Sequence, residues 1–399
     1  MLFEQDRIEI ITARKKTQVE EFLKIRGLTL EADVELTIGL FRGKTLIGTG
    51  SIAGNIIKCV AVSCKVTGEG IALKLVSELV NHAYSMGRRK LYVYTKPQYR
   101  PIFSGAGFST LAEVPETVTL LENSSSRLAT YIKELEQYRK TGANIAGIVM
   151  NANPFTLGHR YLVEKACQEN DWVHLFVVKE DASEFAYDVR LRLILDGLEH
   201  LDNVTVHEGS DYIISKATFP TYFIKDKQIV EDAHARLDLT LFRNHIAPAL
   251  GINRRYVGSE PFCTVTSHYN RVMKEVFDDS AMPCPVIEVK EVRRHEQSGH
   301  AVSASRVREL IGSGELDKLS ALVPASTLSY INKEHINKEH TNKGHTNKGH
   351  TNKGHTNKGH TNKGHTNKGH TNKGHTNKGH TNKGHTNKEY PANPFYTMN

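Results

Sequence analysis

The chain has 399 residues, a length that favours two domains, and a formal net charge of +8 at pH 7. Twelve lysines and three glutamates after residue 330 carry +9, which leaves −1 for residues 1–330 and argues against a nucleic-acid-binding surface. The five cysteines form no Cys-x-x-Cys pair, and the chain shows no signal peptide or membrane span, so we expect a cytoplasmic protein with reduced thiols.

The first part of the chain, residues 1–125, has the pattern of a mixed α/β domain. Alternating or continuous apolar residues predict strands over 34–41, 45–52, 56–62 and 91–94. Helical spacing of Ile71, Leu75 and Leu79 predicts a helix that reaches Ala83. A polar run at 122–126 and a helical pattern over 128–138 predict a linker helix within residues 126–143.

From residue 144 strands and helices alternate. Predicted strands cover 145–150, 172–178, 204–207, 256–257 and 286–289. Predicted helices cover 158–168, 187–200, a long region that ends near 249, 267–276 and 305–311. Such alternation predicts a parallel sheet covered on both faces, with ligands at the carboxyl ends of the strands near the switch in strand order. We therefore predict a second domain over residues 144–330.

The remainder, residues 331–399, is of low complexity. Residues 331–390 are twelve pentads, nine of which read Thr-Asn-Lys-Gly-His. Because apolar residues are almost absent from the pentads, we expect a disordered tail. Its eleven histidines at five-residue spacing leave binding to metal or to an anionic surface as the alternative.

The most informative segment is 147–163, which combines a buried strand, a proline-containing loop and a helix that opens at Gly158 and His159. This arrangement directs free backbone N–H groups and the positive end of a helix at an anion. Gly158 permits close backbone approach, His159 adds a donor that can be charged near neutral pH, and Thr156 supplies a hydroxyl.

A second anion-binding pattern lies near residue 303. Ser303 and Ser305 lie at the start of a predicted helix and are followed by Arg306, whose guanidinium can bridge phosphate oxygens. The alternative interpretation of this motif is a helix N-cap followed by solvated arginines.

Together the two motifs resemble the nucleotidyltransferase superfamily, which has a His/Thr-x-Gly-His motif after the first strand and a late Ser-rich motif followed by Arg. The resemblance implies ATP with Mg²⁺ as substrate, with Mg²⁺ bridging phosphate oxygens and with catalytic contacts from His159, Thr156 and Arg306. It implies further nucleotide contacts from residues around both motifs and from a segment that resembles the stretch beside the adenosine: Asn151, Pro154, Phe155, Gly158, Gly258, Ser259, Glu260, Ser303 and Ser305. Segment 185–190 resembles one whose arginine, here Arg190, approaches the phosphates or the substrate.

The N-terminal domain carries a shorter glycine-bearing loop, from Lys65 through Gly68 and Gly70, between a strand and a helix. It resembles the pyrophosphate-binding loop of the GNAT acetyltransferases, and segment 99–108 resembles their last helix and Gly-Phe turn. Lys65 replaces the usual Gln or Arg, and no general base is evident. The resemblance therefore implies binding of a CoA-like group rather than acetyl transfer.

A GNAT-like mixed α/β domain followed by a Rossmann-like nucleotidyltransferase domain resembles the citrate (pro-3S)-lyase ligase family, across roughly residues 1–330. This resemblance implies a ligase that joins acetate to the thiol of the CoA-like prosthetic group on the citrate lyase acyl carrier subunit. ATP would be converted to AMP and pyrophosphate through acetyl-adenylate. The N-terminal domain could then bind the pantetheine arm of the carrier.

Three questions stay open at this level. In the insert 211–227, Lys225 is a candidate to pair with a small carboxylate, while the aromatic residues there pack onto the sheet. The first alternative function is an adenylyltransferase for a phosphorylated cofactor precursor such as phosphopantetheine, served by arginines: Arg190, Arg192, Arg254 and Arg255. The second is a non-catalytic sensor of CoA or nucleotide.

Overall fold

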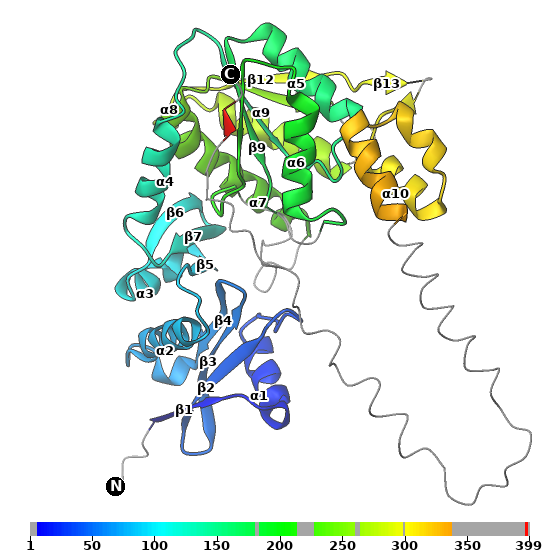
Figure 1. The fold of residues 1–399 in the computed structure, drawn as a ribbon. Helices are drawn as coiled ribbons and strands as arrows, with labels where there is room; N and C mark the ends of the chain where they lie inside the picture. The colour runs from blue at the N-terminus through cyan, green and yellow to red at the C-terminus, as the bar shows by residue number, and fades with distance from the viewer. Residues whose placement is uncertain are drawn as a thin grey trace, which may run out of the picture.

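A computed structural model of the chain describes residues 6–179, 183–213, 227–259, 264–297, 300–336 and 396–397. Figure 1 shows two α/β domains, with α4 (Arg127–Glu136) running alongside the second. The predicted fold class, a mixed α/β domain followed by a parallel-sheet domain, is confirmed. Within these ranges no helix is long and apolar enough to cross a membrane. Lys225, Glu260 and nearly all of the histidine repeats lie outside the described residues.

The N-terminal domain is built on a seven-stranded sheet in the order β1-β2-β3-β4-β5-β7-β6, in which only β4 and β5 run parallel. Its strands are β1 (Asp6–Ile10), β2 (Leu36–Arg42), β3 (Thr45–Ala53), β4 (Ile56–Val62), β5 (Tyr92–Thr95), β6 (Ser109–Val114) and β7 (Val118–Glu122). Its helices are α1 (Ala13–Lys24), α2 (Ile71–Ser85) and α3 (Arg100–Gly105), with short 3₁₀ turns η1 (Cys64–Val66) and η2 (Pro97–Tyr99).

Strands β4 and β5 form the parallel pair within this otherwise antiparallel sheet. The two strands pair only through Ile56–Tyr92 and Ile57–Val93. Helix α2 follows β4 and packs Leu75, Val76 and Leu79 against the sheet, while Val19 and Leu23 of α1 belong to a second apolar cluster. The end of β5 therefore lacks its parallel neighbour, and a cavity described below opens beside it.

The C-terminal domain contains a parallel sheet in the order β12-β11-β8-β9-β10, to which a two-residue strand, β15 (Tyr396–Thr397), adds antiparallel to β10. The parallel strands are β8 (Ile145–Met150), β9 (Trp172–Val177), β10 (Val204–His207), β11 (Arg254–Gly258) and β12 (Glu288–Val292). The chain proceeds from β8 to β9 on one side and later to β11 on the other, so the strand order reverses at β8. This is the switch point at which parallel sheets bind ligands.

Helices cover both faces of this sheet, as predicted. One apolar cluster lies under α5 and α6, and another lies under α7, its extension and α9. The helical elements of this domain are α5 (Leu157–Glu169), α6 (Tyr187–Leu198), α7 (Lys227–Leu241), the π-helical turn η4 (Phe242–Ile246), α8 (Ala247–Leu250), α9 (Thr264–Asp278), α10 (Ala304–Ser313) and η5 (Leu316–Ala321). A small ladder of β13 (Glu296–Gln297) and β14 (His300–Ala301) precedes α10.

The last described helix spans 325–336 and crosses the domain boundary that we expected at residue 330. Ile331 is 4% exposed and lies in one cluster with Val307 and Leu310 of α10. The structured part of the chain therefore includes the first pentad of the repeat, which, like the second, begins with isoleucine where the third and later pentads have threonine.

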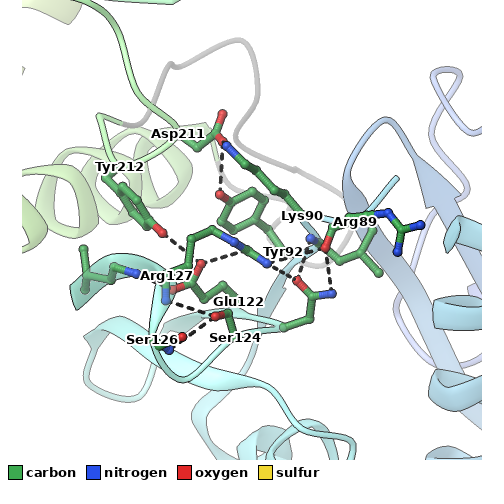
Figure 2. Close-up of polar contacts among 12 residues, drawn as sticks. Arg89, Lys90, Tyr92, Glu122, Ser124, Ser126, Arg127, Asp211 and Tyr212 are labelled. Carbon is green, nitrogen blue, oxygen red and sulfur yellow. Dashed lines mark hydrogen bonds and ion pairs between the residues drawn. The ribbon is translucent and has the colours of Figure 1, made fainter. Parts of the chain in front are cut away.

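The two domains share an apolar interface. Tyr92 and Tyr94 of β5 and Leu120 of β7 pack in one cluster with Leu237 and Leu241 of α7. Figure 2 shows a polar network at the rim of this cluster, where Tyr212 donates to Glu122 Oε2 at 3.0 Å and Arg127 Nη1 lies 2.9 Å from the same oxygen. Helix α7 therefore packs its apolar side chains against the N-terminal sheet and joins the two domains through a buried contact.

Candidate functional site

The loop between β8 and α5 crosses the switch point and is fixed by contacts along its length. Ala152 has a φ of 48°, in the left-handed region. The side-chain oxygen of Asn153 accepts a hydrogen bond from the backbone of Phe185 at 3.0 Å, and its carbonyl accepts one from Arg308. Asn151 pairs with Ser183 at 3.1 Å. These hydrogen bonds hold the loop, and with it the start of α5, in one position.

Thr156 and His159 form a reciprocal cap at the start of α5. The backbone N–H of His159 donates to Thr156 Oγ1 at 3.3 Å, and the backbone N–H of Thr156 donates to His159 Nδ1 at 3.1 Å. Thr156 is 1% exposed, whereas His159 is partly exposed. Because Nδ1 accepts a backbone hydrogen bond, the neutral ring carries its proton on Nε2, which is left to donate.

Burial, with a smaller effect from the positive charge of Arg294, lowers the pKa of His159 to about 4. The sequence alone allowed His159 to be either charged or neutral near neutral pH, and its lowered pKa favours the neutral ring there. The Phe155 ring is fully buried and stacks on the His159 ring with centroids 5.9 Å apart. Phe155 and the buried Pro154 thus support the site from the core rather than facing a ligand.

The two predicted motifs lie side by side. A Cβ on Gly158 would fall 2.9 Å from the carbonyl oxygen of Val302, the residue before Ser303. Only glycine permits this approach, which brings the starts of α5 and α10 together. Gly158 and Val302 are about 145 residues apart in the sequence, so their contact could not be predicted from the sequence motif.

At the start of α10, Ser303 caps the helix by accepting from the backbone of Arg306 at 3.2 Å. Ser305 accepts from Arg308 at 3.2 Å, and Arg308 in turn reaches the loop at Asn153. Arg306 is exposed and pairs with Glu309 at 3.2 Å. Such a surface pair is worth little, so the guanidinium can exchange this partner for a phosphate.

The end of β11 borders the site on the other side of β8. Gly258 closes the strand, and Ser259 is held by Arg294, whose Nε donates to the Ser259 carbonyl at 2.9 Å and whose backbone donates to Ser259 Oγ at 3.3 Å. We did not predict Arg294, although it lies nine residues before Ser303 in an Arg-Arg-His run. Its charge close to His159 makes this edge of the sheet attractive to anions.

Arg190 is a structural residue as well as a candidate substrate contact. Its side chain is fully buried, and its guanidinium donates to the carbonyls of Asn151 at 2.6 Å, Val178 at 3.0 Å and Phe185 at 3.1 Å. It therefore joins the ends of β8 and β9 beneath the loop. Such a residue positions a site through the backbone.

The N-terminal domain contains a separate cavity of about 880 Å³, within the size range of small-molecule sites. Gly68 and Gly70, with φ of 91° and 73°, lie on its wall at the start of α2, and a Cβ on either would meet no atom within 4 Å. Thr95 of β5 and the next residue, Lys96, also line the cavity. Lys65 is exposed on η1 and is not part of the lining.

The parallel sheet with two helix starts beside its switch point defines the class: an α/β protein with a ligand site at the carboxyl edge of its sheet. The sequence also matches known proteins. The family model described as the citrate lyase ligase C-terminal domain matches residues 145–331. A citrate (pro-3S)-lyase ligase from Klebsiella pneumoniae is 47% identical over 82% of this chain and 95% of its own length. The Escherichia coli K12 protein of that name is 46% identical over 82% and 92%. The chain belongs to the citrate (pro-3S)-lyase ligase family and is an enzyme of the ligase class.

Other similarities are weaker. A phosphopantetheine adenylyltransferase from Streptococcus gordonii is 27% identical over 25% of this chain and 63% of its own length. Solved structures of an acyl-CoA N-acyltransferase from Pseudomonas aeruginosa and of Escherichia coli ElaA each cover 30% of this chain and 100% of their own, at 13% and 14% identity and a TM-score of 0.27. The fold class of the N-terminal domain is therefore assigned from the order and direction of its own strands.

Proposed function

We propose that this chain uses ATP to activate acetate as acetyl-adenylate and then transfers the acetyl group to the thiol of the citrate lyase carrier subunit. An acetate oxygen attacks the α-phosphorus, the bond to the β-phosphate oxygen breaks, and pyrophosphate leaves. The carrier thiolate then attacks the acetyl carbonyl and AMP leaves. The observation that supports this proposal most strongly is the joining of two anion-binding helix starts through Gly158 at the switch point of the sheet.

The roles of the residues follow from their surroundings. We assign His159 Nε2 to an oxygen of the α- or β-phosphate and Arg306, with the start of α10, to the pyrophosphate that leaves. Thr156 fixes the orientation and tautomer of His159, since its hydroxyl and backbone are both engaged at the cap. Asn151, Gly258 and Ser259 lie on the loop and strand end that border the nucleotide.

Mg²⁺ would enter with ATP, held by phosphate oxygens and water, as is usual for this ion. In the described part of the chain no group of three or more His, Cys, Asp or Glu side chains could hold a metal ion. The charge of the bound ion would add to that of Arg306 as pyrophosphate leaves.

The adenylyltransferase alternative needs arginines for a second phosphate-bearing substrate, and three of the four candidates are engaged elsewhere. Arg190 binds backbone carbonyls, and Arg254 pairs with Glu288 at the start of β11. Arg255 is buried over the Phe242 ring at 4.4 Å, on the α7 face of the sheet. These contacts favour a small acid over a phosphomonoester.

Acetate-dependent exchange of labelled pyrophosphate into ATP tests this proposal. We expect the full chain to catalyse exchange with acetate and to respond less to larger acids, with no carrier present. Exchange that requires 4′-phosphopantetheine instead of acetate would replace the ligase with the adenylyltransferase. Exchange that survives His159→Ala undiminished would remove His159 from the site.

We also propose that the N-terminal cavity holds a CoA-type group. Its glycines direct the start of α2 at a phosphate, its walls include Val60, Ile71 and Phe103 for an apolar arm, and Lys96 adds a positive charge. Cys64 lines the cavity and is exposed, so it provides a probe. Desulfo-CoA, which has no thiol to consume the reagent, should slow alkylation of Cys64, and the protected signal should disappear in Cys64→Ser; an unchanged rate would argue against this ligand.

A further inference from the structure

Strand β5 forms a wall between the N-terminal cavity and the C-terminal domain. Val93 packs into the core beneath α2, and Thr95 lines the cavity. Tyr92 and Tyr94, on the opposite face of the strand, pack into the cluster shared with α7. Because the side chains of a strand alternate between its two faces, β5 contacts the cavity on one face and the interface with the other domain on the opposite face.

The contacts on the interface face reach the loop that follows β10 (Figure 2). Tyr92 donates to Asp211 at 3.2 Å, and Tyr212 donates to Glu122 at 3.0 Å. Glu122 is 1% exposed and belongs to β7, which pairs with β5. Arg127 and the backbone of Leu128 also donate to this carboxylate, so its position is fixed.

From that loop the contacts continue to the nucleotide site. The backbone N–H of Gly209 donates to Tyr187 at 2.6 Å, and a Cβ on Gly209 would collide with the end of β9. Arg190 lies over the Tyr187 ring at 5.5 Å and donates to the carbonyl of Asn151. An unbroken series of contacts thus joins β5 to the first residue of the nucleotide loop.

The cavity itself lies far from that loop. Figure 1 shows α2 and α3, which border the cavity, in the N-terminal domain, and α10 on the opposite side of the molecule. A ligand in the cavity would therefore influence adenylation through the protein rather than react with the adenylate. This separation also argues against simple insertion of the carrier arm into the cavity during acetyl transfer.

We infer that the N-terminal domain is an effector domain, in which a CoA-type ligand favours adenylation in the C-terminal domain through β5 and the Glu122–Tyr212 contact. The inference rests on the proposed function for the reaction that is favoured. The sign of the coupling between the two sites follows from the position of the cavity, which opens where β5 is no longer paired with β4. A ligand there holds β5 and so stabilises the contacts on its other face, which makes the coupling positive and reciprocal.

The probe is desulfo-CoA, which has no thiol and cannot accept an acetyl group. Calorimetry on the full chain measures the Kd of ATP with and without desulfo-CoA, and exchange with acetate is measured under the same two conditions. We expect desulfo-CoA to lower the Kd of ATP roughly fivefold and to raise kcat/KM for exchange by a similar factor. The binding measurement does not need acetate chemistry, so an absence of exchange would count against the proposed function alone.

Two variants test the route. Tyr212→Phe removes the donor and Glu122→Leu the acceptor of the hydrogen bond between Tyr212 and Glu122. Each should reduce the effect of desulfo-CoA to less than about twofold while basal exchange persists. Tyr84→Phe is the matched control, because Tyr84 contacts Asn123 within the N-terminal domain and should keep the full effect. A thermal unfolding curve of each variant separates loss of coupling from loss of fold.

Three results would overturn the inference: no binding of desulfo-CoA, binding without any change in ATP affinity, or full coupling in Tyr212→Phe. A competition experiment identifies the source of the ligand. If the carrier subunit with an alkylated prosthetic thiol displaces desulfo-CoA, the effector is the carrier arm. If it does not, free CoA is the effector, and the same coupling holds.

Discussion

The loops that lead into α5 and into α2 both place glycine at the start of a helix, but the glycines are required for different reasons. Gly158 has no room for a side chain, because the carbonyl of Val302 lies where its Cβ would point. Gly68 and Gly70 have open space and are required by their left-handed backbone, with φ of 91° and 73°. The first site is assembled by contact between distant segments, and the second by local chain geometry beside an open cavity.

This difference also separates what each loop can do. The α5 loop is pinned by Arg190, Arg308 and the Thr156–His159 cap, as expected for a site that must orient reacting groups. The α2 loop borders a large cavity and carries no comparable cap, since Gly70 offers no side chain to the helix start. We expect chemistry at the first and ligand binding at the second.

Substitution of the two kinds of glycine should give the largest contrast. Gly158→Ala forces apart the starts of α5 and α10, and a displacement of about 1 Å at a reacting site can cost roughly 100-fold in rate. Gly70→Ala introduces backbone strain of about 1–2 kcal/mol but should leave acetate-dependent exchange within about twofold. Exchange rates together with melting temperatures decide the matter. Equal losses in both variants would contradict the contrast.

His159 should act as a neutral donor. His159→Ala should lower kcat for exchange by roughly 100-fold, the usual effect of losing one donor to developing charge. Because its pKa is lowered to about 4, the wild-type rate should show no inflection near pH 6.5 from this group. Below that pKa, protonation of Nδ1 would break the bond from the Thr156 backbone. A pH–rate profile that loses an inflection near 6.5 in His159→Gln would show a charged donor instead.

Truncation of the chain near residue 330 should have a smaller effect, on stability. A chain that stops at residue 336 should fold and retain exchange activity, whereas one that stops at residue 330 loses buried Ile331 beside α10. Loss of a buried isoleucine should lower the free energy of unfolding by about 2 kcal/mol or more. Urea titration of both chains measures this difference. Equal stability would mean that residues 331–336 of the final helix contribute nothing to the packing against α10.

The two domains should also differ in their response to acid. In the C-terminal sheet His174 Nδ1 and His207 Nε2 lie 2.9 Å apart and fully buried, and burial lowers the pKa of His174 to about 3 and that of His207 well below its usual value. Since the unfolded chain binds these protons first, stability should fall as the pH drops below about 6.5, by up to about 1.4 kcal/mol per pH unit for each histidine.

The variant His174→Leu/His207→Phe tests this acid sensitivity. Its free energy of unfolding should depend less steeply on pH between about 6.5 and 4.5 than that of the wild type. An unchanged slope in the double variant would assign the acid sensitivity to other groups.

Much of the architecture could be predicted because local pattern and burial agree. The strand at 56–62 was predicted with the observed bounds, and the helices from 71 and 187 to within two residues, because each has a clear apolar face. Strand β7 was not predicted, since Val118–Glu122 is buried throughout and does not alternate. Strand β12 begins two residues later than expected and extends further, to Val292.

The site motifs could be predicted because a helix start after a strand is a local feature. Their surroundings could not. The close approach of Gly158 to Val302 and the burial that keeps His159 neutral are tertiary effects. So is the use of Arg190 to hold backbone carbonyls. No local pattern distinguishes an arginine that faces a phosphate from one that ties two strands together.

The most direct test of the ligase assignment is the stoichiometry of the complete reaction. Full-length protein is mixed with ATP, labelled acetate and the citrate lyase carrier subunit bearing its prosthetic group, and AMP, free thiol and protein-bound label are followed together. We predict one AMP formed for each thiol lost and each acetyl group bound, and no AMP without acetate. AMP formation without loss of thiol, or transfer of the adenylyl group to a phosphate acceptor, would contradict the account.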